Sequence, residues 1–75
     1  MKRRLKVFFV SDDVIVLLLT GRARILGLPE GCTMERAFYH YSKRGFGIIV
    51  EHDSFEPVEP GCEPPYFSPE IEMVN

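Results

Sequence analysis

Two short runs of aromatic and β-branched residues flank a four-residue turn near the middle of the chain. The runs cover residues 37–41 (Ala-Phe-Tyr-His-Tyr) and 46–50 (Phe-Gly-Ile-Ile-Val), and the segment between them is Ser42-Lys43-Arg44-Gly45. Aromatic and β-branched residues favour strands. Serine first and glycine fourth are typical of a type I turn followed by a glycine in the left-handed conformation. The pattern predicts a β-hairpin; its alternative is a helix that begins at residues 33–36 (Thr-Met-Glu-Arg).

Both faces of this hairpin carry large apolar side chains. With a three-residue loop, alternation places Phe38, His40, Phe46, Ile48 and Val50 on one face and Tyr39, Tyr41 and Ile49 on the other. A two-layer domain of 75 residues covers one face of a sheet with its own chain and hardly covers two. We therefore expect a homo-oligomer, most simply a symmetric dimer. The predicted interface residues are Phe38, Tyr39, Tyr41, Phe46, Ile48 and Ile49.

The first third of the chain predicts a strand, a short helix and a second strand. Residues 5–10 are a compact apolar run that is typical of a buried strand. For residues 11–20 two structures are open: Ser-Asp-Asp suits a helix N-terminus and Thr-Gly its end, whereas the β-branched residues 14–16 favour a strand after a turn. We expect the helix. Charged and apolar residues alternate over 22–26, which indicates a half-exposed strand.

The chain changes character at Asp53, because five of its six prolines follow that residue. Proline excludes a regular helix or a central strand and favours extended backbone. Apolar residues spaced along this tail would anchor it to the rest of the fold: Phe55, Val58, Tyr66, Phe67 and Ile71. We expect one small α+β domain over residues 1–75, with an antiparallel sheet core over 1–52 and an acidic, proline-rich strap over 53–75.

The charged residues are distributed unevenly along the chain, although the net charge is only −2. Residues 1–25 carry a charge of +4, and residues 46–75 carry −7 with no lysine or arginine. Such a chain can fold its acidic end over its basic end or dock against a second copy. We do not expect a nucleic-acid partner, because the acidic tail would repel phosphate. An anion-binding rim is an alternative use of the basic residues Arg3, Arg4, Arg22 and Arg24.

The residues that could carry metal or catalytic chemistry lack the necessary spacing. Cys32, Cys62, His40 and His52 form no Cys-x-x-Cys or His-x-x-x-His pair. We therefore expect no metal and no cofactor. Two cysteines 30 positions apart are too few for a disulfide framework, and free thiols are expected, with a single bridge as the alternative. A small hydrolase that uses His52 and the neighbouring acids is a third functional hypothesis.

No segment predicts passage through a membrane. The basic start of the chain and the apolar residues 7–10 resemble a targeting signal, but Asp12 and Asp13 interrupt the run. The apolar stretch at 14–19 is far shorter than a span requires. We expect a cytoplasmic protein.

A scattered set of residues resembles a pattern in short uncharacterised bacterial and phage proteins. It comprises Leu28-Pro-Glu-Gly31, Val50-Glu-His52, Ser54-Phe55, Pro57-Val58 and Gly61. The resemblance implies an accessory or virus-associated protein rather than a metabolic enzyme, and it transfers no functional residue. The leading hypothesis is accordingly a non-enzymatic binding protein that acts as a homo-oligomer and presents a surface to another protein. The alternative is a binder of an anionic small molecule or nucleotide at a subunit interface.

Overall fold

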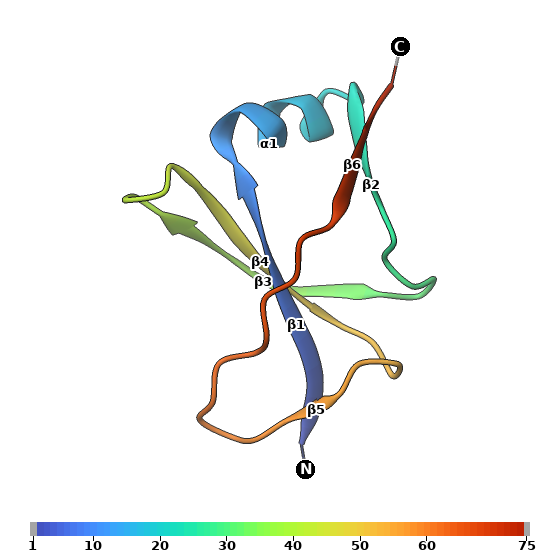
Figure 1. Ribbon diagram of the computed structural model, residues 1–75, viewed down its shortest axis with the longest axis vertical. Helices are drawn as coiled ribbons and strands as arrows, with labels where there is room; N and C mark the ends of the chain where they lie inside the picture. The colour runs from blue at the N-terminus through green and yellow to red at the C-terminus, as the bar shows by residue number, and fades with distance from the viewer. Residues whose placement is uncertain (1, 75) are drawn as a thin grey trace.

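The computed structural model describes residues 2–74, which form one helix and six strands. The elements are β1 (Arg3–Ser11), α1 (Asp12–Leu19), β2 (Ala23–Leu26), β3 (Thr33–His40), β4 (Gly45–Glu51), β5 (Pro57–Val58) and β6 (Glu70–Met73). Four strands make an antiparallel sheet in the order β3-β4-β1-β5, and β2 pairs with β6 in a separate two-stranded sheet (Figure 1). The predicted α+β class, the central hairpin and the single short helix are confirmed.

Strand β1 is an inner strand of the sheet, which explains why it is apolar on both sides. It pairs with β4 from Leu5 opposite Glu51 to Ser11 opposite Gly45. Its other edge is closed by the tail. Val7 and Phe8 point to opposite faces, and each is only 2% exposed. An inner strand covered on both faces is expected to be continuously apolar rather than alternating.

Helix α1 begins directly after β1 and has well-formed ends. The hydroxyl of Ser11 accepts a hydrogen bond from the backbone N–H of Val14 at 3.4 Å, and two aspartates occupy the first turn. At the other end Gly21 adopts φ 76°, where its N–H donates to the carbonyl of Leu18 at 3.3 Å. These caps outweigh the strand preference of residues 14–16, and the helix prediction is confirmed.

The hairpin forms, but its predicted facing is wrong. His40 pairs with Gly45, so the loop has four residues rather than three. This difference of one residue puts Phe38 and His40 on the face opposite Phe46, while Tyr39 joins Phe46 with ring centroids 5.0 Å apart. The helical alternative at 33–36 is also wrong, because these residues belong to β3 and contain a β-bulge.

Glycine is required at position 45 for a reason that differs from the predicted one. The left-handed residue of the loop is Arg44, with φ 52°. A Cβ on Gly45 would lie 2.4 Å from the Phe9 ring and 2.4 Å from the carbonyl oxygen of Val10. Strand β4 therefore needs glycine so that β1 can approach closely.

The core lies on the face of the large sheet that α1 covers, which we call the helix face. Its fully buried residues are Phe8, Val10, Ile48, Val50 and Phe55. The partly buried apolar residues that pack against them come from α1, β2, the following loop and the tail: Val14, Ile15, Leu18, Ile25, Leu28, Cys32, Phe46 and Phe67. The opposite face of the sheet carries Val7, Phe9, Phe38 and Ile49.

The proline-rich tail runs along the edge of β1 and contributes side chains to both faces of the sheet. Strand β5 pairs with the first residues of β1, and the N–H and C=O of Val7 then bond to Pro65 and Phe67 at 3.0 and 2.9 Å. Phe67 stacks edge-on against Phe8 on the helix face, with ring centroids 5.4 Å apart. Tyr66 lines a small recess on the opposite face. The chain then ends in β6, beside β2 (Figure 1).

Candidate functional site: an apolar helix face and the groove beside it

The molecule is flat and has more surface than a compact protein of its size. Its principal extents are 41 × 30 × 16 Å, and its radius of gyration is 12.9 Å. A compact chain of 75 residues has a radius of gyration of about 11 Å. The solvent-accessible surface is 5561 Å², whereas a folded monomer of 8.6 kDa exposes about 4,700 Å². The surplus is about 900 Å² by that comparison.

Helix α1 contributes exposed apolar surface, because its side chains are apolar on all sides. After its two aspartates it reads Val-Ile-Val-Leu-Leu-Leu, and none of its residues is fully buried. Val14, Ile15 and Leu18 contact the core. On the outer side Val16 is 57% exposed and Leu19 is 81% exposed. A helix with apolar residues all round is normally buried on all sides.

An apolar groove adjoins this helix. It lies between α1, β2 and the helix face of the sheet, has a volume of about 460 Å³, and reaches the surface beside Leu19 and Met34. Among the described residues that line it, Arg24 is the one with a charge, and Leu28 and Cys32 form part of its wall. Burial raises the pKa of the Cys32 thiol, which keeps it protonated and a poor nucleophile at neutral pH. The groove is suited to apolar contact rather than to covalent chemistry.

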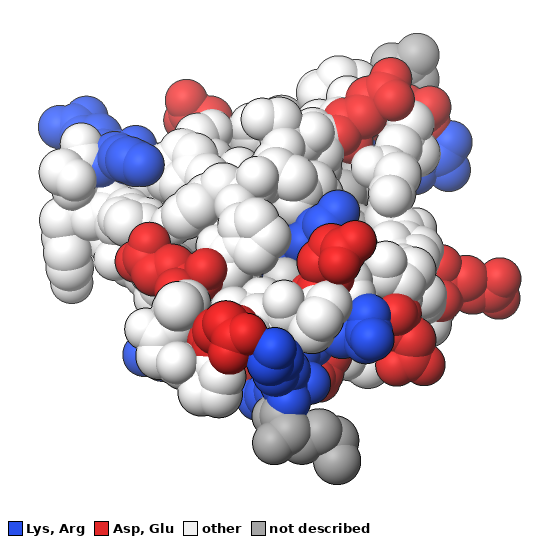
Figure 2. All heavy atoms as spheres, turned by 60° about the horizontal axis from the view of Figure 1, so that its bottom comes forward, with Lys and Arg blue, Asp and Glu red and all other residues white. Residues whose placement is uncertain are grey.

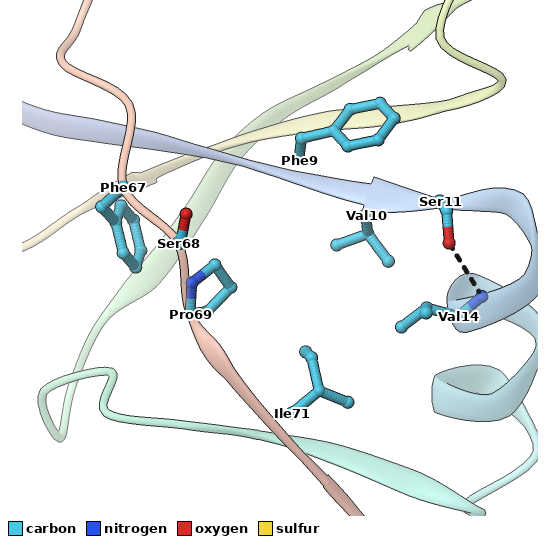
Figure 3. Close-up of a pocket in the computed structure, with 8 residues that line it drawn as sticks. All are labelled: Phe9, Val10, Ser11, Val14, Phe67, Ser68, Pro69 and Ile71. Atoms are coloured by element: carbon cyan, nitrogen blue, oxygen red, sulfur yellow. Dashed lines mark hydrogen bonds between the residues drawn. The ribbon is translucent and has the colours of Figure 1, made fainter.

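A second recess lies between the end of β1, the start of α1 and the tail, with a volume of about 340 Å³ (Figure 3). Val10, Val14 and Ile71 point into it, while Phe9 points to the other side of β1. The hydroxyl of Ser11 at its margin accepts the capping hydrogen bond of α1. This recess is walled mainly by apolar side chains of β1, α1 and the tail.

The structure does not bring the four predicted ligand-binding arginines together. Arg3 and Arg4 lie at the start of β1, whereas Arg22 and Arg24 lie at β2, at the other end of the molecule (Figure 1). Arg24 pairs with Glu72 across the small sheet. Arg4 donates to the backbone carbonyl of Phe55 at 2.8 Å. With Arg3, described next, three of these four guanidinium groups already have partners within the chain.

Arg3 forms a charged cluster with Glu35 and Glu51. Its guanidinium donates to Glu35 at 2.8 Å and to Glu51 at 2.8 and 3.1 Å. The hydrogen bond to Glu35, followed by that to Glu51, raises the pKa of Arg3, and the same contact lowers the pKa of Glu35. Acidic and basic side chains alternate over the face that Figure 2 shows. Ion pairs of Lys2 with Glu59, Arg3 with Glu51 and Arg24 with Glu72 thus neutralise part of the charge polarity of the sequence within the fold.

The six hairpin residues predicted as an interface are exposed to very different degrees. Ile48 is buried, and Phe46, Ile49 and Phe38 are half-buried. Tyr39 donates a hydrogen bond to a carboxylate of α1, and only Tyr41, at 86% exposed, extends fully into solvent. The outer face of α1 was missed by sequence reasoning. The available signal was the unbroken apolar run at 14–19, since a helix with that sequence has no polar side.

The two histidines have local structural roles. The ring nitrogens of His52 lie 2.8 Å from the hydroxyl of Ser54 and 2.9 Å from the carbonyl oxygen of Glu30. His40 is at the opposite end of the hairpin, where its ring packs edge-on against Phe9 and Phe38. The structure does not bring the two imidazoles together.

Within residues 2–74, no three His, Cys, Asp or Glu side chains are grouped closely enough to hold a metal ion. Cys32 and Cys62 are both free. No helix in the described part of the chain has the length and apolar character needed to cross a membrane.

Comparison with known proteins found no matching family model, no matching curated protein and no matching solved structure.

Proposed function

We propose that this chain is a non-enzymatic interaction protein that acts as a homo-oligomer, most simply a symmetric dimer. One observation carries the proposal: the outer face of α1 leaves Val16 and Leu19 in solvent, on a molecule with about 900 Å² of surplus surface. A standard protein–protein interface buries about 800 Å² on each partner. The surplus therefore matches what one such contact would remove.

The surroundings of the ionisable residues support a binding role over catalysis. Both ring nitrogens of His52 have hydrogen-bonding partners within the chain, and the Cys32 thiol is held protonated by its apolar surroundings. Arg3, Arg4 and Arg24 donate to groups of the same chain, so an anionic ligand would have to compete with them. Neither the hydrolase nor the anion-binding hypothesis gains a specific observation in its favour.

The cytoplasm is the compartment that we propose, since reducing conditions keep thiols free and both cysteines are unpaired. A further protein partner is compatible with a dimer that leaves the hairpin tip and Tyr41 exposed.

The test is the mass of the purified protein in solution. Light scattering after size exclusion, and sedimentation equilibrium from micromolar concentration upward, should give at least twice the chain mass of 8.6 kDa. A mass of one chain at every concentration, in a protein that circular dichroism shows to be folded, would refute the proposal. Because the contact is mainly apolar, we expect it to persist when salt screens surface charges.

A further inference from the structure

Strand β2 has one edge that pairs with β6 and one edge that is free. The register of the two strands extends to Arg22 opposite Val74, where the N–H of Val74 donates to the carbonyl of Arg22 at 2.8 Å. In an antiparallel pair, residues that bond to their partner alternate with residues that do not. Ala23 and Ile25 therefore direct their N–H and C=O groups away from β6. No other backbone group among residues 2–74 bonds to them.

The free edge of β2 follows the apolar groove. Ala23, Arg24 and Ile25 all line the groove, whereas no described residue of β6 does. Successive residues of a strand point to opposite faces, so three in a row line one hollow where it runs along the edge of the strand. The groove therefore lies beside the edge that β6 leaves free, and a strand added there, about 4.8 Å from β2, would occupy it.

The groove provides room and apolar surface for side chains. Its volume of about 460 Å³ falls within the roughly 300–1,000 Å³ that is typical of ligand-binding pockets. Leu19 and Met34 at its margin are among the most exposed large apolar residues of the described chain. An occupant with aliphatic side chains would remove both from water, and this burial is favourable.

Strand β6 shows which sequence pairs with β2. Residues 71–73 (Ile-Glu-Met) lie opposite residues 23–25 (Ala-Arg-Ile) in antiparallel register. Glu72 forms an ion pair with Arg24 on one side of the ribbon, and the apolar residues of both strands lie on the other side, where Ile25 packs against the core. A strand on the free edge meets the same two sides of β2. It is therefore expected to have the same alternation of apolar, acidic and apolar residues.

Arg24 has donors left for a second carboxylate. Its Nε and Nη2 both donate to one oxygen of Glu72, while no hydrogen bond from Nη1 is formed within residues 2–74. The side chain of Arg24 is 65% exposed, and no acidic residue is among the described residues that line the groove. The charge at the free edge is therefore positive, and an acidic side chain opposite Arg24 is complementary to it.

We propose that the free edge of β2 and the groove beside it bind an extended peptide segment of another protein. The segment adds to β2 as an antiparallel strand, in which two aliphatic side chains enter the groove and an acidic side chain between them faces Arg24. Backbone hydrogen bonds hold such a strand, and the alternate side chains select its sequence. The inference goes beyond the proposed function, because a single chain contains the whole site and self-association is not required.

The other free strand edges fit a peptide less well. The edge of β3 contains a β-bulge between Met34 and Arg36 and carries Glu35 and Arg36 in its middle, and both features hinder the addition of a strand. The free edge of β6 adjoins the recess of Figure 3, and none of the strongly exposed apolar residues of the described chain lines that recess. A peptide there would bury less apolar surface.

A synthetic peptide with the expected alternation tests the site. The probe is fluorescein-labelled Ser-Thr-Leu-Glu-Leu-Thr-Ser, titrated with the purified full chain and followed by fluorescence anisotropy. It should bind one-to-one with a Kd below about 1 mM. A peptide with lysine in place of glutamate sets like charges opposite each other at Arg24 and should bind at least about fivefold more weakly.

Methylation of the peptide backbone tests the addition of a strand. In antiparallel pairing the N–H groups of both leucines point to β2, and that of the glutamate points away. A methyl group on the nitrogen of the second leucine should raise the Kd at least about fivefold, because one hydrogen bond is lost. A methyl group on the glutamate nitrogen is the matched control and should leave the Kd within about twofold of the unmodified peptide.

Residues of the chain itself locate the bound peptide. Cys32 is in the groove wall and Cys62 is exposed outside it. The peptide at saturation should slow the alkylation of Cys32 by iodoacetamide and leave that of Cys62 unchanged. Met34→Ala at the groove margin should raise the Kd about threefold or more, whereas Met73→Ala, at a similarly exposed residue of β6, should not change it. Circular dichroism checks that each variant is folded.

The outcomes separate this inference from the proposed function. Absence of saturable binding overturns the inference. So does binding that is unaffected by the methyl group on leucine, or that leaves Cys32 unprotected, because the peptide is then not paired with β2. A monomeric protein that binds the peptide supports this inference and refutes the proposed function. A dimer that does not bind it supports the proposed function and refutes this inference.

Discussion

Truncating Leu19 offers the sharpest measurement of the apolar part of the proposed contact. Leu19 is 81% exposed in the single chain, so replacing it with alanine removes almost no packing within the fold. The free energy of unfolding of the monomer should change by no more than about 0.5 kcal/mol. In the dimer the same side chain would be covered by the partner. Leu19→Ala therefore separates association from folding.

The size of the effect on association follows from the exposed fraction. Leucine to alanine removes three carbon groups, each worth about 0.8 kcal/mol when fully buried. With 81% of the residue available for new burial, each chain loses about 2 kcal/mol, and the symmetric dimer loses about 4 kcal/mol. That upper value corresponds to a rise in Kd of roughly 700-fold, and coverage of half the exposed area to roughly 30-fold.

The matched control is Tyr41→Ala at the hairpin tip. Tyr41 is 86% exposed, so the two residues differ little in exposure. The hairpin interface predicted from the sequence includes Tyr41, whereas the α1 contact does not. Sedimentation equilibrium should show weakened association for Leu19→Ala and wild-type association for Tyr41→Ala. The reverse result, with the tyrosine variant monomeric and the leucine variant dimeric, would refute the reasoning from α1.

Two further predictions concern the fold. Gly45→Ala should lower the free energy of unfolding by about 1–3 kcal/mol, because its Cβ meets the fixed carbonyl of Val10 at 2.4 Å. Gly47→Ala should cost less, since its close neighbour is only the movable ring of Phe38; equal urea midpoints for the two variants would contradict this. The phenol of Tyr39 donates to a carboxylate of α1, and this hydrogen bond raises its pKa above 10. Its stabilising contribution is complete below pH 10 and disappears as the pH rises through the higher folded-state value. An absorbance titration should show one late tyrosine that Tyr39→Phe removes, and three tyrosines titrating together would be the contrary result.

The hairpin illustrates how far sequence reasoning reaches. Strand propensity and turn chemistry predicted the two strands and located the turn to within one residue, since these are local properties, although β3 begins at Thr33, four residues before the predicted run. The register was wrong because the loop gained one residue and Arg44, rather than Gly45, took the left-handed conformation. The requirement at Gly45 comes from β1, which lies across a long sequence separation. No local pattern contains that information.

The helix shows the same division between local and distant causes. Serine, two aspartates and the Thr-Gly stop predicted where α1 begins and ends, because caps are formed by neighbouring residues. The side of α1 that faces the sheet depends on the direction in which the chain leaves β1. An all-apolar run has no polar side, so its sequence does not indicate which side is buried. The exposure of Val16 and Leu19 therefore required the structure.

The sequence predicts that a chain this short leaves one apolar face of its sheet uncovered. In the structure the exposed apolar surface lies elsewhere, on the outer side of α1. The tail partly covers the opposite face with Pro64 and Tyr66, while α1 and Phe67 cover the helix face. The element that covers the helix face is itself apolar on its outer side. The uncovered surface is thereby moved from the sheet to Val16 and Leu19, one layer further out. A polar outer side would have made α1 an ordinary amphipathic helix and the chain self-sufficient. Apolar residues there gain burial only through a partner.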